Sequence, residues 1–431
     1  MVHSPDDPML TMLPLPATEV PLLDQDERPC YLDSAATSLK PRAVIDRITR
    51  FYAEENAPVH RGVYELSQRA TDLYEQARRT VAAFVGADPE GLVFTRGTTE
   101  GLNLVARAWA EEHLKPGDEL IASPQEHHSN FIPWQEVARR TGATLHFAPL
   151  RANGTLDLDG TLALIGRRTK LVAMAHVSNV LGIENPAREV FAAAKAVGAV
   201  TVLDGAQSVP TRPVDVADLE CDALAFSAHK MLGPTGIGAL AVRPALLEQM
   251  TVYQTGGGMI ERVAVEGTTF LDGFARYEAG TPNAAGAVGF AAACDYLDTL
   301  TYDGRDGMEA VAAYEHAWGQ HAANQVRAIE GVRLIGPPDD CDVEGGIVAL
   351  QMDGLHPHDL AVLLDAQGVM CRAGHHCTMP LHAHLSDSGA HPATSLRASA
   401  YVYNTLDDAD RLAEALRFAH KALTRRTVAA G

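Results

Sequence analysis

The chain has 431 residues, of which 46% are hydrophobic and 21% are charged. A chain of this length can bury a large core, so the composition predicts a soluble globular protein with one large domain and a smaller one. Its 55 acidic side chains outnumber its 35 basic ones and give a formal net charge of -20. This negative field would repel a phosphate backbone and disfavours nucleic acid as a partner.

No segment approaches the roughly 20 apolar residues of a membrane helix, and the first residues lack the basic and apolar regions of a signal peptide. We therefore expect a cytoplasmic protein with no membrane partner. The cysteines are dispersed and form no C-x-x-C pair, so we expect reduced thiols, one of which could be a nucleophile. They are Cys30, Cys221, Cys294, Cys341, Cys371 and Cys377.

Residues 1–30 are rich in Pro and Asp without a sustained period, which predicts a tail or an arm lying on the body. Residues 31–290 alternate short apolar runs with helical segments, and this alternation predicts a large domain with a mostly parallel sheet covered by helices. The apolar runs begin at Leu92, Glu119, Lys170, Ala199 and Ala223.

Residues 291–431 follow a different order and predict a smaller α+β domain. A helix over 308–329 precedes the strand GGIVALQM, and a helix over 358–367 precedes the strands VMCRA and SLRASAYVY. A closing helix is expected from Leu406. The predicted fold class is therefore α/β, with a smaller α+β domain at the C-terminus.

Lys230, in SAHKMLGPTGIG, follows an apolar strand and precedes a glycine-rich stretch. A buried ammonium is costly unless it is neutralised or used, although a lysine after a strand is more often solvated. About 25 residues upstream, VLDGAQS ends another apolar strand with Asp204 and Gln207. A carboxylate beside a pyridine nitrogen would keep pyridoxal 5'-phosphate (PLP) protonated, but Asp204 could equally cap a helix, and Gln207 could be polar surface.

A phosphate site is indicated by TRGTTEGLNLVA, in which a helix begins near Thr98. Backbone N–H groups and the hydroxyls of Thr98 and Thr99 at a helix N-terminus would bind an anion. The alternative is an ordinary capping box. Ser227 and His229 flank Lys230 and could complete the phosphate site.

The segment CRAGHHCTMPLHAHL concentrates thiols and imidazoles, which are preferred ligands of zinc, so a metal site is an alternative to a nucleophilic cysteine there. Its candidate ligands are Cys371, His375, His376, Cys377, His382 and His384.

Eight motifs in this order resemble the class V aminotransferase group, and most closely the Suf-type cysteine desulfurases and related selenocysteine lyases. The resemblance runs from Tyr31 to the end of the chain and implies a PLP-dependent transferase of fold type I that converts L-cysteine to L-alanine. The motifs are NAPVHRGVYELS, FTRGTTEGLNLVA, QEHHSNFIPWQ, HVSNVLGIENP, VLDGAQSVPT, SAHKMLGPTGIG, YEAGTPN and RAGHHCTMPLH.

The resemblance also implies how the cofactor is bound. Lys230 would form the Schiff base and His127 would stack on the pyridine ring, while Asp204 and Gln207 would tune it. Thr281, in YEAGTPN, would reach the phosphate of the neighbouring subunit's cofactor, which implies a homodimer with shared active sites. The phosphate of the same subunit would be held by Thr98, Thr99, Ser227 and His229.

For the substrate, the resemblance implies that Asn179 and Arg397 orient it, with Arg397 pairing with its carboxylate. His60 and Arg61 match residues at the pocket mouth. By the same match Cys377 is the nucleophile that accepts sulfur as a persulfide, no metal is needed, and a protein acceptor then takes the sulfur. Arg372 is also expected to bind the substrate. Arg372 and the paired histidines are candidates for lowering the pKa of Cys377, whereas Cys371 is expected to be buried.

The sequence departs from the pattern at Pro58 and Tyr64, where the family often has Asn and His, and in the long insert HAHLSDSGAHPAT after Cys377. These changes leave substrate and partner open. The alternatives are a selenocysteine lyase, a relative acting on another amino acid in a specialised pathway, and a catalytically silent PLP-binding scaffold. The sulfur acceptor could be an iron–sulfur assembly protein or a dedicated biosynthetic carrier.

Overall fold

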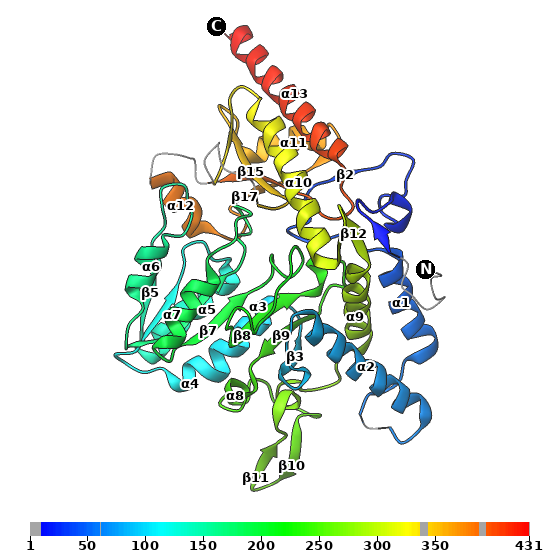
Figure 1. The fold of residues 1–431 in the computed structure, drawn as a ribbon, viewed down its shortest axis with the longest axis vertical. Helices are drawn as coiled ribbons and strands as arrows, with labels where there is room; N and C mark the ends of the chain where they lie inside the picture. Colours follow the sequence, from blue (N-terminus) through cyan, green and yellow to red (C-terminus); the bar gives the residue numbers. More distant parts are fainter. Residues whose placement is uncertain (1–9, 61, 337–343, 388–393, 431) are drawn as a thin grey trace.

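The computed structural model describes residues 10–60, 62–336, 344–387 and 394–430. Two domains are stacked along the long axis of the molecule, the larger one below the smaller one in Figure 1. Arg61, Cys341 and part of the insert after Cys377 lie outside the described residues. Among the described residues, no helix combines the length and the apolar character needed to cross a membrane.

The large domain is built on a seven-stranded sheet of order β3-β9-β8-β7-β6-β4-β5, in which β9 is antiparallel to both of its neighbours and the other adjacent pairs are parallel. The predicted mostly parallel sheet is thus confirmed. Its strands are β3 (Leu92–Thr95), β4 (Glu119–Ala122), β5 (Thr144–Phe147), β6 (Thr169–Ala175), β7 (Val200–Asp204), β8 (Ala223–Ser227) and β9 (Gly238–Val242).

Helices cover both faces of this sheet because its central strands are apolar on both sides. On β7, Val202 packs in the cluster that contains α3 and α5, and Leu203 packs in the cluster that contains α2, α7 and α9. The helices of this domain are α1 (Arg42–Arg50), α2 (Glu65–Phe84), α3 (Thr98–Val105), α4 (Glu111–His113), α5 (Ile132–Thr141), α6 (Leu158–Leu164), α7 (Ala187–Ala196), α8 (Pro244–Leu247) and α9 (Ala284–Asp298).

The smaller domain has an antiparallel sheet of order β14-β15-β18-β17 covered by long helices. The expected strand VMCRA is divided at Cys371, since its halves join two different sheets. The elements are α10 (Gly307–Arg327), β14 (Val332–Leu334), β15 (Ile347–Met352), α11 (Pro357–Asp365), β16 (Val369–Met370), β17 (Arg372–Gly374), α12 (Met379–Asp387), β18 (Ser395–Ser399) and α13 (Leu406–Ala430).

The segment expected to be a tail or arm is packed onto both domains from residue 10 onward. Strand β1 (Thr11–Met12) pairs with β12 (Leu300–Tyr302), which also pairs with β13 (Arg305–Asp306). Strand β2 (Cys30–Tyr31) pairs with β16. Both pairings join segments that lie far apart in the sequence. They bring the residues just after Tyr31 to the boundary between the domains.

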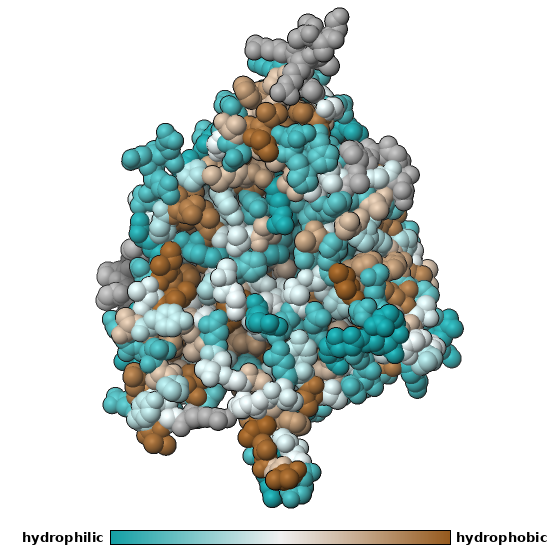
Figure 2. All heavy atoms as spheres, turned by 180° about the vertical axis from the view of Figure 1, so that it is seen from behind, coloured by the Kyte–Doolittle hydropathy of each residue, from teal (hydrophilic) through white to brown (hydrophobic). Residues whose placement is uncertain are grey.

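A hairpin of β10 (Ile260–Ala264) and β11 (Gly267–Phe270) projects from the large domain at the bottom of Figure 1. The same projection carries hydrophobic side chains in Figure 2, and Val263 and Val265 are exposed there. Exposed apolar residues on a projecting hairpin are typical of a surface that packs against another chain.

A buried ion pair fixes the segment that carries the YEAGTPN motif. Arg78, on α2, is 1% exposed and forms a two-pronged contact with Glu278, at 2.7 and 2.8 Å. Glu278 also accepts the backbone N–H of Phe94 at 2.7 Å. The pair therefore joins α2, β3 and the residues just before Thr281.

We expect Arg78→Met to lower the midpoint of urea unfolding, by an amount equivalent to about 3 kcal/mol, because it leaves the Glu278 carboxylate buried and unpaired. The matched control is Arg79→Met on the same helix. The Arg79 side chain is exposed and, among the described residues, bonds Gln76 alone. Equal midpoints for the two variants would contradict a structural role for the buried pair.

Candidate active site

A pocket of about 230 Å³ lies where the carboxyl ends of β6, β7 and β8 meet the start of α3 and the loop after β17. Ligands of open α/β sheets bind at this end of the strands. The structure brings most of the predicted site residues together around it. They are Thr98, Thr99, His127, Asn179, Asp204, Gln207, Ser227, His229, Lys230, Arg372, Cys377 and Arg397.

Lys230 ends the short helical turn η6 (Ala228–Lys230) that follows β8. Burial, assisted by the charges of Arg397 and Arg372 and opposed by Asp204, lowers the pKa of its amine to about 8. An amine with this pKa loses its proton far more readily than a solvated lysine. Lys230 is therefore suited to act as a nucleophile or base near neutral pH.

Asp204 ends β7 and is 4% exposed. Burial raises its pKa, although a hydrogen bond from the Ala206 N–H, at 2.9 Å, and the nearby Lys230 oppose that shift. A buried carboxylate with so few donors is suited to pair with a cationic ring nitrogen. Gln207 donates one amide hydrogen to the carbonyl of Ala35, at 2.8 Å, which leaves its second N–H for a ligand.

Hydroxyl groups gather at the N-terminus of α3. The Oγ of Ser227 accepts the backbone N–H of Thr98 at 2.8 Å and lies 2.7 Å from the Thr98 hydroxyl. Thr99 bonds the hydroxyl of Ser129 at 2.8 Å. Gly97 has φ 152°, and a Cβ there would lie 3.1 Å from Ser227 Oγ, so the turn needs glycine to bring backbone and hydroxyls this close.

The ring of His127 is held neutral. Its Nδ1 accepts the backbone N–H of Ser129 at 3.1 Å, which places the ring proton on Nε2. Burial, followed by the charge of Lys230, lowers the pKa of His127 to about 3. A neutral imidazole over the pocket is suited to stack on an aromatic ring.

Arg397, on β18, is almost fully buried, and burial lowers its pKa. Its Nη2 bonds Asp33 at 3.0 Å and its Nη1 bonds the carbonyl of Asn179 at 2.9 Å. Its Nε has no partner among the described residues. The guanidinium is thus held at the pocket wall with one donor unused, as expected of a group that binds a carboxylate.

Cys377 lies on a tightly held loop. His376 and Cys377 have φ 50° and 57°, a conformation that non-glycine residues rarely adopt. Asn179 Nδ2 donates to the carbonyl of His376 at 2.8 Å, Thr378 donates to Asn179 Oδ1 at 3.1 Å, and the His128 N–H donates to the carbonyl of Cys377 at 2.7 Å. These bonds hold the half-buried Cys377 at the pocket.

Two of the histidines near Cys377, His376 and His382, bond the same hydroxyl group. His376 Nε2 and His382 Nε2 lie 3.1 and 3.0 Å from the hydroxyl of Ser395, and burial lowers the pKa of His376 to about 2. Within the described ranges, no group of three or more His, Cys, Asp or Glu side chains is arranged to hold a metal ion. Cys371 is half-buried rather than fully buried, and the pKa of its thiol is raised by burial.

Two predicted residues do not reach this pocket within one chain. His60 has φ 70°, and its ring bonds Glu75 at 2.9 Å, which turns the side chain toward α2. Thr281 is exposed on the surface after the turn η7 (Gly273–Tyr277). Arg61 lies outside the described residues. The roles that the resemblance implies for these three residues stay predictions.

Sequence analysis missed three residues that contribute to the site. Ser129 lines the pocket, and the adjacent motif QEHHSN could have pointed to it. Asp33 holds Arg397, and Ala35 lines the pocket and binds Gln207. Both belong to YLDSAATS, the start of the resemblance.

Comparisons with known proteins agree with this geometry. The family model described as "Aminotransferase class-V" matches residues 30–412. A cysteine desulfurase of Haloferax volcanii is 45% identical over 396 residues, covering 91% of this chain and 90% of the relative. One of Escherichia coli O127:H6 is 44% identical over 395 residues, covering 91% and 94%.

Solved structures give the same result. The apo structure of cysteine desulfurase from Thermococcus onnurineus NA1 has a TM-score of 0.87 at 38% identity, covering 94% of this chain and 97% of that one. The cysteine desulfurase CsdA (S-sulfonic acid) from Escherichia coli has a TM-score of 0.84 at 37% identity, with the same coverage. This chain belongs to the class V aminotransferase family and groups with its cysteine desulfurases.

Proposed function

We propose that this chain is a PLP-dependent cysteine desulfurase that converts L-cysteine to L-alanine and retains the sulfur as a persulfide on Cys377. The observation that carries the proposal is the position of Cys377, which lines the same pocket as Lys230 and Asp204 although it comes from the other domain. The relatives named cysteine desulfurase support it.

The pocket residues fit PLP. The buried Asp204 suits the ring nitrogen, and the hydroxyls of Thr98, Thr99 and Ser227 at the start of α3 suit the phosphate. Lys230, the last residue of η6, would bind the cofactor covalently. When bound, PLP withdraws electrons from the substrate Cα.

The protein's own groups place the substrate and move its proton. The buried Arg397 would bind the substrate carboxylate through its unused Nε–H, with Arg372 lining the same pocket. Lys230 Nζ would remove the Cα proton, as a general base whose pKa burial has lowered to about 8. The neutral His127 would cover the ring without adding charge.

Sulfur transfer needs no outside oxidant or reductant. The Cys377 thiolate attacks the substrate sulfur, and the new S–S bond forms as the Cβ–S bond of the substrate breaks. The electron pair of the broken bond passes to the carbon fragment, which takes up a proton at Cβ and receives the proton back at Cα from Lys230 before it leaves as alanine. The outer sulfur of the Cys377 persulfide would then be transferred to a protein acceptor.

Cys377→Ala should retain the visible absorption of bound PLP but lose most alanine release from cysteine, because the cofactor residues lie on other segments. Cys371→Ala is the matched control and should be nearly neutral, since burial raises the pKa of that thiol and it does not line the pocket. After brief exposure to cysteine, mass spectrometry should find one added sulfur on the peptide with Cys377. Full turnover by Cys377→Ala on cysteine would refute sulfur transfer, and turnover on selenocysteine alone would favour a selenocysteine lyase.

The loop of Lys230 is anchored by an upstream segment. The carbonyl of His229 accepts the Ser38 N–H at 2.9 Å, the Ser38 hydroxyl at 3.1 Å and Lys40 Nζ at 2.9 Å. The Ser38 hydroxyl also accepts the N–H of Leu232, which has φ 66°. Ser38 thus bridges both ends of the turn that presents Lys230, without lining the pocket itself.

Ser38→Ala should lower kcat about tenfold, because small misplacements of a reacting group are costly, and leave the KM for cysteine nearly unchanged. The pH at which the cofactor's visible band changes should also shift, which a merely structural defect would not cause. Ser38→Thr keeps the hydroxyl and should restore both values. Wild-type kcat in Ser38→Ala would show that the bridge does not position Lys230.

We infer that the active protein is a homodimer with shared sites. The inference is supported by the exposure of Thr281, which the family resemblance assigns to the neighbouring cofactor, and by the exposed Val263 and Val265 on the projecting hairpin.

Mixing Lys230→Ala with Thr281→Ala after subunit exchange should recover about one quarter of wild-type activity, since half of the dimers then hold one intact site. Each variant alone, carried through the same exchange, is the control. No recovery with proven heterodimers would place Thr281 in its own subunit's site, and a fully active monomer would refute the dimer.

A further inference from the structure

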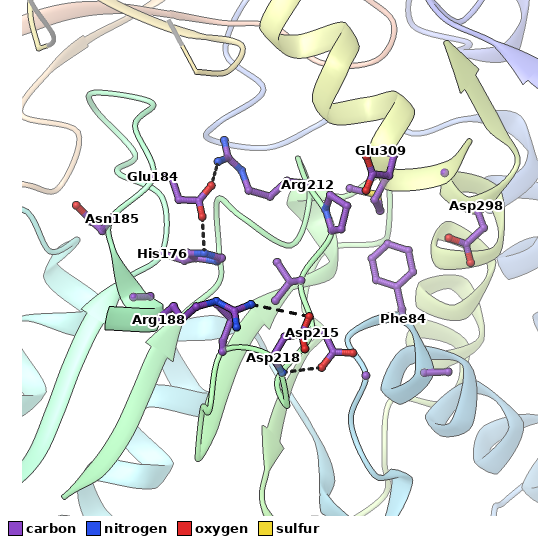
Figure 3. A pocket seen from close by; sticks show the side chains of 18 of the residues that line it. Phe84, His176, Glu184, Asn185, Arg188, Arg212, Asp215, Asp218, Asp298 and Glu309 are labelled. Atoms are coloured by element: carbon purple, nitrogen blue, oxygen red, sulfur yellow. Dashed lines mark hydrogen bonds and ion pairs between the residues drawn. The ribbon is translucent and has the colours of Figure 1, made fainter. Parts of the chain in front are cut away.

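A cleft of about 1320 Å³ lies on the far side of β6 from the cofactor pocket. It is enclosed by the ends of α2 and α9, the start of α10, the segment before α7 and the loop after β7 (Figure 3). None of the residues that line it lines the cofactor pocket. Its walls are rich in carboxylates and contain two arginines, Arg188 and Arg212.

On one wall of this cleft, two carboxylates are paired with the arginines. Glu184 pairs with Arg212 and lies 3.3 Å from His176 Nε2, and Arg188 lies 3.9 Å from Asp218. Figure 3 shows these partners turned toward one another. Both arginines are thus engaged within their own wall.

The opposite wall carries carboxylates that lack counter-ions. Asp295 and Asp298, on α9, and Asp306 and Glu309, at the start of α10, are exposed, and none forms an ion pair with a described basic residue. Although both side chains are exposed to solvent, partial desolvation by the cleft walls raises the pKa of Asp295 and Asp298, and the charge of Asp295 also raises the pKa of Asp298. A positive charge placed there would be stabilised.

A second observation comes from the buried side chain of His176. It is 3% exposed and lines the cleft, and its Nδ1 has no hydrogen-bond partner among the described residues. A buried ring nitrogen without a partner is costly, so it favours a ligand that supplies one. The flanking Ala175 and Val177 line the cofactor pocket, which places His176 in a wall shared by the two cavities.

The shape and chemistry of the cleft restrict the ligand. Within the described ranges the carboxylates are too dispersed to hold one metal ion. The volume exceeds the roughly 300–1,000 Å³ of a small-molecule pocket. Between the carboxylates lie Phe84, Val214 and Met308, and apolar surface beside carboxylates suits side chains with long apolar stems and cationic ends.

We propose that this cleft docks an extended segment of a partner protein that carries several lysine or arginine side chains. The segment's cations pair with the carboxylates of α9 and α10, their stems cover the apolar floor, and its main chain supplies a partner for His176. The proposal goes beyond sulfur transfer and does not depend on it.

The test measures the fluorescence anisotropy of a labelled, unstructured peptide of alternating lysine and alanine, titrated with holoenzyme. Asp295→Asn with Asp298→Asn should weaken binding about fivefold, since two ion pairs are lost. His176→Phe removes the ring nitrogens and should weaken it as well. Alanine release from cysteine should stay at the wild-type rate in the double variant, because neither residue lines the cofactor pocket.

The matched control is Asp359→Asn with Asp365→Asn, which removes the same charge from exposed positions on α11. It should leave peptide affinity nearly unchanged. Equal weakening by the two pairs would show that the peptide responds only to the net charge of -20, and would overturn the proposal. The absence of saturable binding, or tighter binding of spermine than of the peptide, would overturn it too. If His176→Phe fails to fold, the difference in peptide affinity between the two double aspartate variants still tests the proposal.

Discussion

The hydrogen bonds made by residues 33–40 hold the active-site pocket together. Asp33 binds Arg397, the carbonyl of Ala35 binds Gln207, and Ser38 with Lys40 binds the carbonyl next to Lys230. These three partners come from β18, from the loop after β7 and from the turn after β8. One short segment therefore fixes the positions of Arg397, Gln207 and the turn of Lys230 relative to one another, although these residues come from both domains.

A second set of contacts between the domains lies at the loop that carries Cys377. Asn179, from the large domain, binds the carbonyl of His376 and the hydroxyl of Thr378, and its own carbonyl binds Arg397. Asn179 therefore positions both the loop and the arginine. Two consecutive residues with positive φ carry strain that such bonds must offset. The result is a thiol from one domain held over the lysine of the other.

The active-site pocket and the cleft differ in the charge of the side chains that line them. Among the described residues, the active-site pocket combines Lys230, Arg372 and Arg397 with one lining carboxylate, Asp204, which suits the carboxylate of an amino acid and a phosphate. The cleft behind β6 has the opposite sign. His176 lies in the wall between them, and its backbone N–H donates to the carbonyl of Asp204 at 3.0 Å, so one hydrogen bond separates a residue that lines the cleft from a residue that lines the pocket.

Much of the fold could be predicted from the sequence, because central parallel strands and amphipathic helices have distinct periods. The helix from Leu406 and the strands beginning near Leu92, Glu119 and Ala223 were predicted correctly. Strands β5 and β9 were missed, since β5 is an exposed edge strand and β9 follows a glycine-rich stretch that is typical of a loop. The division of VMCRA between two sheets depends on pairing with β2, about 340 residues upstream, which local pattern cannot reveal.

The sequence by itself determined the chemistry of the site, since Lys230, Asp204, the Thr98 helix start and Cys377 each stand in a motif whose residue types suit one cofactor and one nucleophile. Only the tertiary structure decided which partners hold them. Asp33, Ser38 and Ser129 act through contacts with residues far away in the chain, and no spacing along the sequence encodes such contacts. The neutral ring of His127 and the lowered pKa of Lys230 also follow from burial, which arises only when both domains close around the pocket.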